Sequence, residues 1–162
     1  MTSVSTPSQG QQGLYTPDQR RRRDSSVWTR VQGVLAPLQF VVFLVSLALV
    51  LRYMMTGEGY AVATASIILK TGLLYLIMIT GAIWEKVVFD QWLFAPAFFW
   101  EDVVSFGVIA LHSLYLYGLL TGAMPPDTLI LVVLAAYAAY VVNAGQFLWK
   151  LRRARLQIGV AA

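Results

Sequence analysis

Three acidic side chains lie at the two ends of one aromatic stretch, residues 84–102, whose sequence is WEKVVFDQWLFAPAFFWED. Glu85 lies at its start, and Glu101 and Asp102 close it. A carboxylic acid that keeps its proton near neutral pH can act as a general acid, and an ionised carboxylate beside it can act as the base. Because three carboxylates gathered by one connection repel one another, we expect at least one to keep its proton. The stretch predicts acid–base chemistry, although Glu101 and Asp102 would also suit a helix start on electrostatic grounds alone.

Two further titratable side chains lie inside the apolar segments that flank this stretch. His112 comes 11 residues after Glu101, about three helical turns, so the two side chains are expected to share one helix face. Lys70 lies about midway along the preceding apolar segment, and Gln39 follows Pro37 in the first one. A charged side chain at the centre of a bilayer costs about 3 kcal/mol on insertion scales, so each such group should have a partner or a role.

Each of these polar side chains has a structural alternative. His112 could be a satisfied core residue, or it could bind the metal of a tetrapyrrole as an axial ligand. Lys70 could pair with a buried carboxylate or with carbonyl groups. Asn143, in the last apolar segment, could contribute to binding or hydrogen-bond between helices.

The aromatic side chains of residues 84–102 are the candidate walls of a binding site for a flat, apolar ligand. Those we single out are Trp84, Trp92, Phe99 and Trp100. Aromatic residues at the edge of a membrane segment also commonly anchor a protein at the lipid headgroups, which is the alternative for each tryptophan.

The composition places these residues in a membrane protein. Of the 162 residues, 58% are hydrophobic and only 12% are charged, whereas soluble domains carry about 25% charged residues. Four segments hold at most one Lys, Arg, Asp, Glu or His side chain each: residues 31–51, 59–84, 103–126 and 128–149. Each is long enough to cross about 30 Å of hydrocarbon as a helix. We therefore predict an all-α polytopic membrane protein with four transmembrane helices, over residues 28–53, 60–84, 102–121 and 128–155, and a kink at Pro37.

The segment between the second and third predicted helices, residues 87–100, is too short and too often interrupted by polar residues and proline to cross the bilayer. Its tryptophan and phenylalanine content favours an interfacial helix or a re-entrant turn. Around the helices we expect three regions: a disordered leader over residues 1–14 without a cleavable signal, a single four-helix domain over residues 15–156, and a short tail over residues 157–162.

Basic residues lie next to the first and last predicted spans. Arginines at positions 20–23 and 30 precede the first span, and Lys150, Arg152, Arg153 and Arg155 follow the last. Basic residues beside a span keep their loops in the cytoplasm, so both termini and residues 84–102 are expected on the cytoplasmic side of the membrane. The net charge of +4 thereby points to the lipid bilayer and not to nucleic acid.

Several kinds of chemistry are excluded by what the sequence lacks. There are no cysteines, so disulfides, thiolate metal sites and cysteine nucleophiles are impossible. No serine triad, HExxH motif or phosphate-binding glycine loop is found, and we predict no protein-bound metal. The residues leave three classes open: an enzyme acting on a flat apolar ligand, a non-catalytic pigment-binding or assembly subunit in which His112 holds the pigment, and a small proton-coupled transporter. The last is disfavoured because no internal repeat is seen and the charges gather at one membrane face.

Four literal stretches carry a family resemblance: YTPDQRRRRDSSVWTRVQGVLAPLQF, TGEGY, WEKVVFDQWLFAPAFFWEDVVSF and YVVNAGQF. Together, across residues 15–156, they resemble the 3-vinyl bacteriochlorophyllide hydratase family of phototrophic bacteria. The resemblance implies addition of water across the C3 vinyl group of a magnesium chlorin, chlorophyllide a or a bacteriochlorophyllide, giving a 1-hydroxyethyl group on the route to bacteriochlorophyll a. It implies no cofactor beyond the magnesium that the substrate carries, since hydration moves no electrons. Other pigment-biosynthesis enzymes are further candidate partners.

The resemblance assigns no catalytic residue, so the roles remain expectations from the side chains themselves. Glu101 or Glu85 is the candidate acid and Asp102 or its neighbour the candidate base. His112 is expected either to bind the substrate magnesium or to relay protons. Candidate partners for the propionate of the substrate are Arg30, Lys86 and Arg152.

Overall fold

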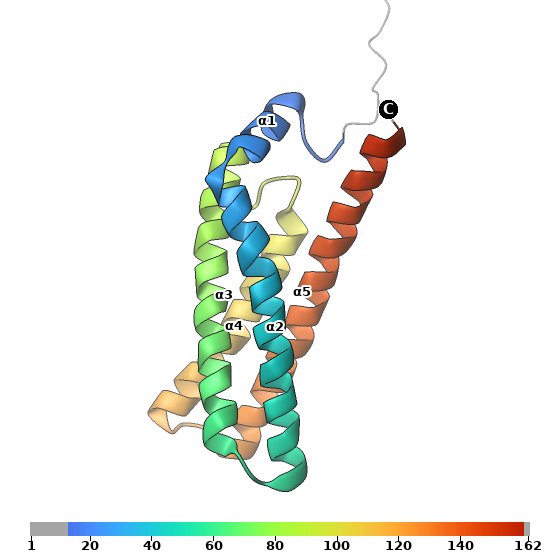
Figure 1. The fold of residues 1–162 in the computed structure, drawn as a ribbon. Helices are drawn as coiled ribbons and strands as arrows, with labels where there is room; N and C mark the ends of the chain where they lie inside the picture. The colour runs from blue at the N-terminus through green and yellow to red at the C-terminus, as the bar shows by residue number, and fades with distance from the viewer. Residues whose placement is uncertain (1–12, 161–162) are drawn as a thin grey trace, which may run out of the picture.

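The computed structural model describes residues 13–160, with side chains up to residue 156, and this part of the chain is entirely helical apart from its connections (Figure 1). The helices are α1 (Pro17–Ser25), α2 (Val27–Thr56), α3 (Tyr60–Phe89), α4 (Phe99–Thr121) and α5 (Pro126–Val160). Helices α2, α3 and α4 and residues Pro126–Leu156 of α5 are long and apolar enough to cross a membrane. The predicted all-α fold with four spans is confirmed, with each helix extending a few residues further than we expected at one or both ends.

Helix α1 precedes the four spans and was not predicted. Thr16 caps it through a capping box with Gln19, and Pro17 occupies its first turn, where its missing N–H costs nothing. Ser26 then ends α1 and caps α2 by accepting a hydrogen bond from the backbone N–H of Trp28. Helix α1 therefore turns into α2 with no loop between them and packs against α3 and α2 at one end of the bundle (Figure 1).

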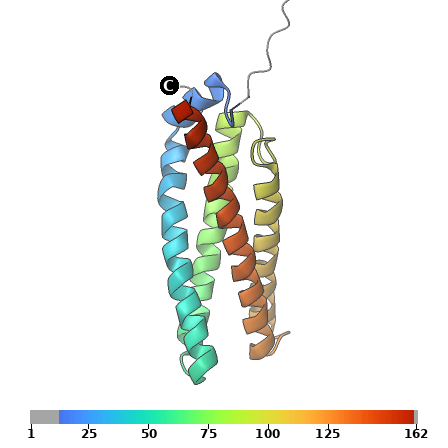
Figure 2. The same ribbon diagram turned by 90° about the vertical axis from the view of Figure 1, so that its right-hand side faces the viewer.

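The four spans form two antiparallel hairpins, α2 with α3 and α4 with α5. Most backbone contacts between helices lie within these two pairs, whereas far fewer join α3 to α4 or α2 to α5. In Figure 2 the four long helices run in roughly the same direction, and α5 is inclined to the others in this view. We call the contact region between the pairs the hairpin seam. Pro37 lies within a continuous α2, so the helix does not break there.

The outer faces of the helices are apolar and exposed, as lipid-facing surfaces should be. Leu69, Leu120 and Leu131 are each more than half exposed. The interior holds a core of small and branched residues with the rings of Phe43, Tyr115, Tyr137 and Tyr140. The polar groups that are buried in this core are thus set between the helices and away from lipid.

The connection between α3 and α4 is not the interfacial helix that was one of the two forms we expected, the other being a re-entrant turn. Helix α3 runs on to Phe89 and α4 begins at Phe99, so residues 87–100 form no separate interfacial helix. Residues 90–98 are bends and turns, with positive φ at Asp90 (61°) and Phe94 (57°). Ala95 and Phe98 are buried, so the connection tucks into the end of the bundle. Two carboxylates hold it there, as described below.

The predicted regions at the chain ends are only partly covered by the structure. Residues 1–12 of the expected leader lie outside the described residues, and Tyr15, just after the leader, is buried. The expected tail, residues 157–162, is helical backbone as far as residue 160.

Candidate functional site

The acidic residues of the sequence analysis meet at one end of the bundle, which we call the carboxylate end. This end comprises α1, the last turns of α3, the connection, the first turn of α4 and the carboxy-terminal part of α5 (Figure 1). Glu85, Glu101 and Asp102 are all there, and only 5%, 5% and 3% of their surfaces are exposed. The expected gathering of three carboxylates by one connection is therefore what the structure shows.

Glu85 and Asp102 form a carboxyl pair, with their side chains close enough to hydrogen-bond to each other. Each also accepts a hydrogen bond from the connection. Asp102 Oδ2 accepts from the backbone N–H of Phe94 at 2.6 Å, and Glu85 Oε2 accepts from that of Ala95 at 3.2 Å. Two consecutive backbone N–H groups thus bind two facing carboxyl groups. Two carboxyl groups so close, with so little water around them, would repel each other strongly if both were ionised, so the pair is suited to hold one proton.

Glu101 is bound separately, by a cation that the sequence analysis assigned only to membrane topology. Lys150 Nζ lies 2.5 Å from Glu101 Oε2 and also donates to the carbonyl oxygen of Ala97. Asn143 donates its Nδ2 hydrogen to the Glu101 carbonyl oxygen at 2.9 Å, and it accepts a hydrogen bond from Ser105 at 3.2 Å. Helix α5 therefore neutralises Glu101 and fixes the start of α4.

The aromatic candidates separate into an inner and an outer group. Trp84 is half-buried, donates its Nε1 hydrogen to Thr29 Oγ1 at 2.9 Å, and packs edge-to-face on Phe89 and Phe98. The other three candidates lie on the outer surface: Trp92 is 60% exposed, Phe99 42% and Trp100 68%. Rings at that position suit the headgroup region of a membrane. Of the four predicted wall residues, Trp84 is the one packed between helices, next to Glu85 at the end of α3.

His112 and Lys70 lie far from the carboxylates, in the middle of the bundle. His112 shares the buried face of α4 with Glu101, as the spacing predicted, but 11 residues separate them, or about 16 Å along the axis. The His112 Nδ1 lies 2.8 Å from the Val108 carbonyl oxygen. Because a carbonyl only accepts, Nδ1 carries the hydrogen, and Nε2 keeps its lone pair in the neutral ring. The candidate residues therefore form two sites along one face.

Lys70 is fully buried at the hairpin seam. Its Nζ lies 3.7 Å from the ring centre of Tyr140, 5.8 Å from that of Tyr137 and 5.9 Å from that of Phe43. Among residues 13–156, neither Lys70 Nζ nor His112 Nε2 has a hydrogen-bond partner. We call Phe43, Lys70, His112, Tyr137 and Tyr140 the seam cluster.

Three members of this cluster, Phe43, Tyr137 and Tyr140, and the cation Lys150 at the other site were not singled out from sequence. The segment AAYAAY gave a signal for two of them, since its tyrosines are three residues apart and so share one helix face. Lys150 gave only a weak one, as the basic residue nearest the last apolar segment.

Two titratable groups outside the spans at the carboxylate end have shifted pKa values. Burial raises the pKa of Tyr15, against the opposing effect of the Arg23 guanidinium, which lies 4.6 Å from the ring centre. The Lys86 ammonium, 2.7 Å from Asp90 Oδ1, lowers the pKa of that exposed carboxyl. Within the described residues, no three His, Asp or Glu side chains are arranged to hold a metal ion.

Comparison with known proteins identifies the family to which these sites belong. The sequence pattern of the family described as 2-vinyl bacteriochlorophyllide hydratase (BCHF) matches residues 15–153. A curated protein of that name from Cereibacter sphaeroides is 66% identical over 156 residues, which cover 96% of this chain and 97% of the relative. A second, from Rhodobacter capsulatus, is 67% identical over 144 residues, covering 89% and 84% of the two chains. No solved structure matches. The chain belongs to the 2-vinyl bacteriochlorophyllide hydratase family.

Proposed function

We propose that this protein is a membrane-bound hydratase that adds water to the vinyl group of a magnesium chlorin, giving a 1-hydroxyethyl group. The observation that carries the proposal is the buried Glu85–Asp102 pair at the carboxylate end of the bundle. Relatives that cover nearly the whole chain are named for hydration of 2-vinyl bacteriochlorophyllide. That name numbers the vinyl position 2, whereas the resemblance described above numbers it 3; the group that reacts is the vinyl group under either name.

The carboxyl pair can divide the work of hydration. The acid transfers its proton to the terminal vinyl carbon, which leaves a cation on the inner carbon in conjugation with the macrocycle. A water molecule then adds to that carbon and gives up a proton to the carboxylate base. One proton and one hydroxide are thereby added, and the pair regains its starting state once the proton passes between the two carboxyls. The pair needs no redox partner, since no electrons are transferred.

The two hydrogen bonds from the connection support a division of roles. Asp102 accepts the shorter bond, 2.6 Å from the Phe94 N–H, whereas Glu85 accepts one of 3.2 Å from Ala95. A shorter N–H bond favours the ionised carboxylate, so we take Asp102 as the base and Glu85 as the acid. Glu101 was the other candidate acid from sequence. Its ion pair with Lys150 makes it a positioning residue that holds the first turn of α4, and with it Asp102.

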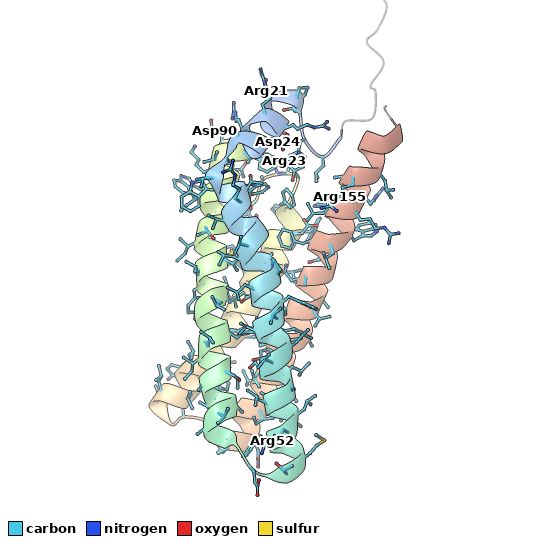
Figure 3. All side chains as sticks on the ribbon, in the orientation of Figure 1. Arg21, Arg23, Asp24, Arg52, Asp90 and Arg155 are labelled. Carbon is cyan, nitrogen blue, oxygen red and sulfur yellow. The ribbon has the colours of Figure 1, made fainter. Side chains whose placement is uncertain are left out.

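The charges outside the spans support a cytoplasmic carboxylate end. Figure 3 places the labelled Arg21, Arg23 and Arg155 at this end of the bundle and Arg52 at the other. The basic residues flanking the first and last spans therefore gather at one face, the arrangement that retains a face in the cytoplasm. A chlorin dissolved in the bacterial inner membrane would reach the carboxyl pair from lipid, while water would reach it from the cytoplasm.

The direct test uses membranes from a host that makes no chlorophyll pigments. Chlorophyllide a is added with no other cofactor, and the red absorption band and the product mass are followed. The expected result is a blue shift with the gain of one water. We expect Glu85→Gln and Asp102→Asn each to lower kcat by about 10²- to 10⁴-fold, the usual contribution of general acid–base catalysis. Glu58→Gln, exposed at the opposite end, is the matched control and should keep full turnover.

Two outcomes would contradict the proposal. Turnover that survives in both carboxyl variants would refute the assigned acid and base. Pigment that binds to the wild-type protein without chemical change would favour a pigment-binding or assembly subunit. The unpartnered Nε2 of His112 is the observation that supports this second candidate.

A further inference from the structure

The seam cluster holds a lysine whose amino group has no acidic partner in the described part of the chain. Lys70 is fully buried, its Nζ has no hydrogen-bond partner among residues 13–156, and no carboxylate of that part lies within 4 Å of it. The three rings around Nζ contribute cation–π attraction, but they supply no acceptor. Removing an ammonium group from water without pairing it is among the most costly arrangements in a membrane interior. Such a group indicates that the missing partner belongs to a ligand.

The position of the cluster also suits a ligand that enters between helices. Phe43 and Lys70 belong to the α2–α3 hairpin, whereas His112, Tyr137 and Tyr140 belong to the α4–α5 hairpin. Contacts between the two hairpins are sparse compared with those inside each. A flat molecule that inserts along the seam would meet aromatic faces from both sides. At the depth of Lys70 it would meet one strong donor and, at His112 Nε2, one free lone pair.

The distance between the two sites decides which part of a chlorin lies at Lys70. Ten residues separate Asp102 from His112 on α4, and ten separate Tyr140 from Lys150 on α5. At 1.5 Å per residue, His112 and Tyr140 lie about 15 Å from the carboxylate end. The Lys70 backbone, 15 residues before Glu85 in α3, lies about 22 Å from Glu85 along that helix, and its Nζ reaches the Tyr140 ring. The metal of a chlorin lies at the ring centre, only half a macrocycle from the vinyl group. The carboxyl of an extended propionate chain, which starts on the ring next to the vinyl-bearing one, lies further from the vinyl group than the metal does.

We propose that Lys70 is the anchor for the propionate carboxylate of the substrate, with the macrocycle lying lengthwise in the hairpin seam and its vinyl group at the Glu85–Asp102 pair. This inference rests on the proposed function, and it adds the residue that recognises the free carboxylate of a chlorophyllide. His112, whose Nε2 carries a lone pair and no hydrogen, does not donate to that carboxylate and does not reach the metal.

The cations considered from sequence are less suited to this task. Lys86 already binds Asp90 at 2.7 Å, and Arg30 and Arg152 are exposed to solvent or headgroups. An exposed cation binds a carboxylate weakly because water competes with it. Lys70 is free of other ionic partners in the described chain and dehydrated, so pairing with it would distinguish a free acid from an ester sharply.

The experiment is a cycle that crosses one protein change with one substrate change. Binding of chlorophyllide a and of its methyl ester is measured by pigment fluorescence in detergent micelles, for the wild-type protein, Lys70→Met and the control Lys86→Met. We expect the wild-type protein to bind the free acid at least about tenfold more tightly than the ester, as is usual for a desolvated charge pair. Lys70→Met should bind the two pigments equally, and Lys86→Met should keep the wild-type preference.

Equal binding of acid and ester by the wild-type protein would overturn the proposal, as would an undiminished preference in Lys70→Met. Because binding is measured without turnover, the result is separate from the hydratase assay. A protein that hydrates both pigments equally would refute the anchor and leave the proposed function standing. A protein that binds the free acid more tightly than the ester but does not hydrate it would support the anchor and refute the proposed function. Lys70→Met should fold, because it replaces an unpaired buried charge with an apolar chain of similar length; Lys70→Gln provides a second variant for the same cycle.

Discussion

Replacing Lys150 with methionine tests how the start of α4 is held. Lys150 Nζ lies 2.5 Å from Glu101 Oε2 and donates a second hydrogen bond to the carbonyl oxygen of Ala97. The side chains of Lys150 and Glu101 are 23% and 6% exposed, so the acid depends on the lysine more than the lysine depends on the acid. Methionine keeps the length of the apolar stem and removes only the ammonium group.

The expected cost follows from the burial of Glu101. Breaking a buried ion pair by removing one partner costs about 3 to 5 kcal/mol, since the other charge is left without compensation. Water reaches the partly exposed position of Lys150 and solvates Glu101 to some extent, so we expect Lys150→Met to lower the free energy of unfolding by about 2 to 4 kcal/mol. Glu101→Gln in the same protein removes the stranded charge, so the double variant should be more stable than Lys150→Met alone.

The assay is unfolding of the purified protein in detergent micelles, followed by circular dichroism at increasing denaturant. Arg152→Met is the matched control, because Arg152 is a nearby exposed cation on the same helix. The reasoning is refuted if Lys150→Met is no more destabilising than Arg152→Met. It is equally refuted if the effects of Lys150→Met and Glu101→Gln simply add, since a real ion pair must show a coupling energy.

Two further predictions concern groups outside the carboxylate pair. Burial raises the pKa of Tyr15 above its ordinary value of 10, so the folded state holds that proton more tightly than the unfolded state does. The stability that comes from docking residues 13–16 should be complete below pH 10 and lost as the pH rises through the raised pKa. Tyr15→Phe should abolish this alkaline step in a fluorescence titration. Gln39 is 2% exposed, and neither polar atom of its amide group has a hydrogen-bond partner among the described residues. Gln39→Leu should therefore raise the free energy of unfolding by about 1 to 3 kcal/mol. A loss of stability in the melting curve would instead show that the amide is hydrogen-bonded in the membrane.

Hydropathy and helical periodicity predicted the parts of the structure that depend on local sequence. The four spans follow from the long uncharged segments, and the shared face of Glu101 and His112 follows from a spacing of three turns. Helix α1 could have been found as well, since Thr16 and Gln19 have the spacing of a capping box just before a run of arginines. The basic run was instead interpreted only as a topology signal.

The pairing of side chains across helices could not be predicted from the sequence. Four basic residues follow the last apolar segment. Lys150 is the nearest of them to that segment, but nothing local predicts that it binds Glu101. The separation of the aromatic residues into an inner and an outer group depends on the path of residues 90–98, which the two carboxyls fix through backbone N–H groups. The sequence also does not reveal that the rings around Lys70 come from both hairpins, because that depends on how the two hairpins pack together.

The division into two hairpins has a consequence for how the protein is made. Lys70 belongs to the first hairpin, whereas Tyr140, the ring nearest its ammonium group, is synthesised 70 residues later. At about 5 to 20 residues per second, the ribosome needs roughly 4 to 14 s to supply that ring. During this time the first hairpin carries a lysine at mid-membrane with only Phe43 beside it, at an insertion cost of about 3 kcal/mol. Release of the α2–α3 hairpin into lipid should therefore wait for the second half of the chain, so membrane insertion and assembly of the seam become a single step.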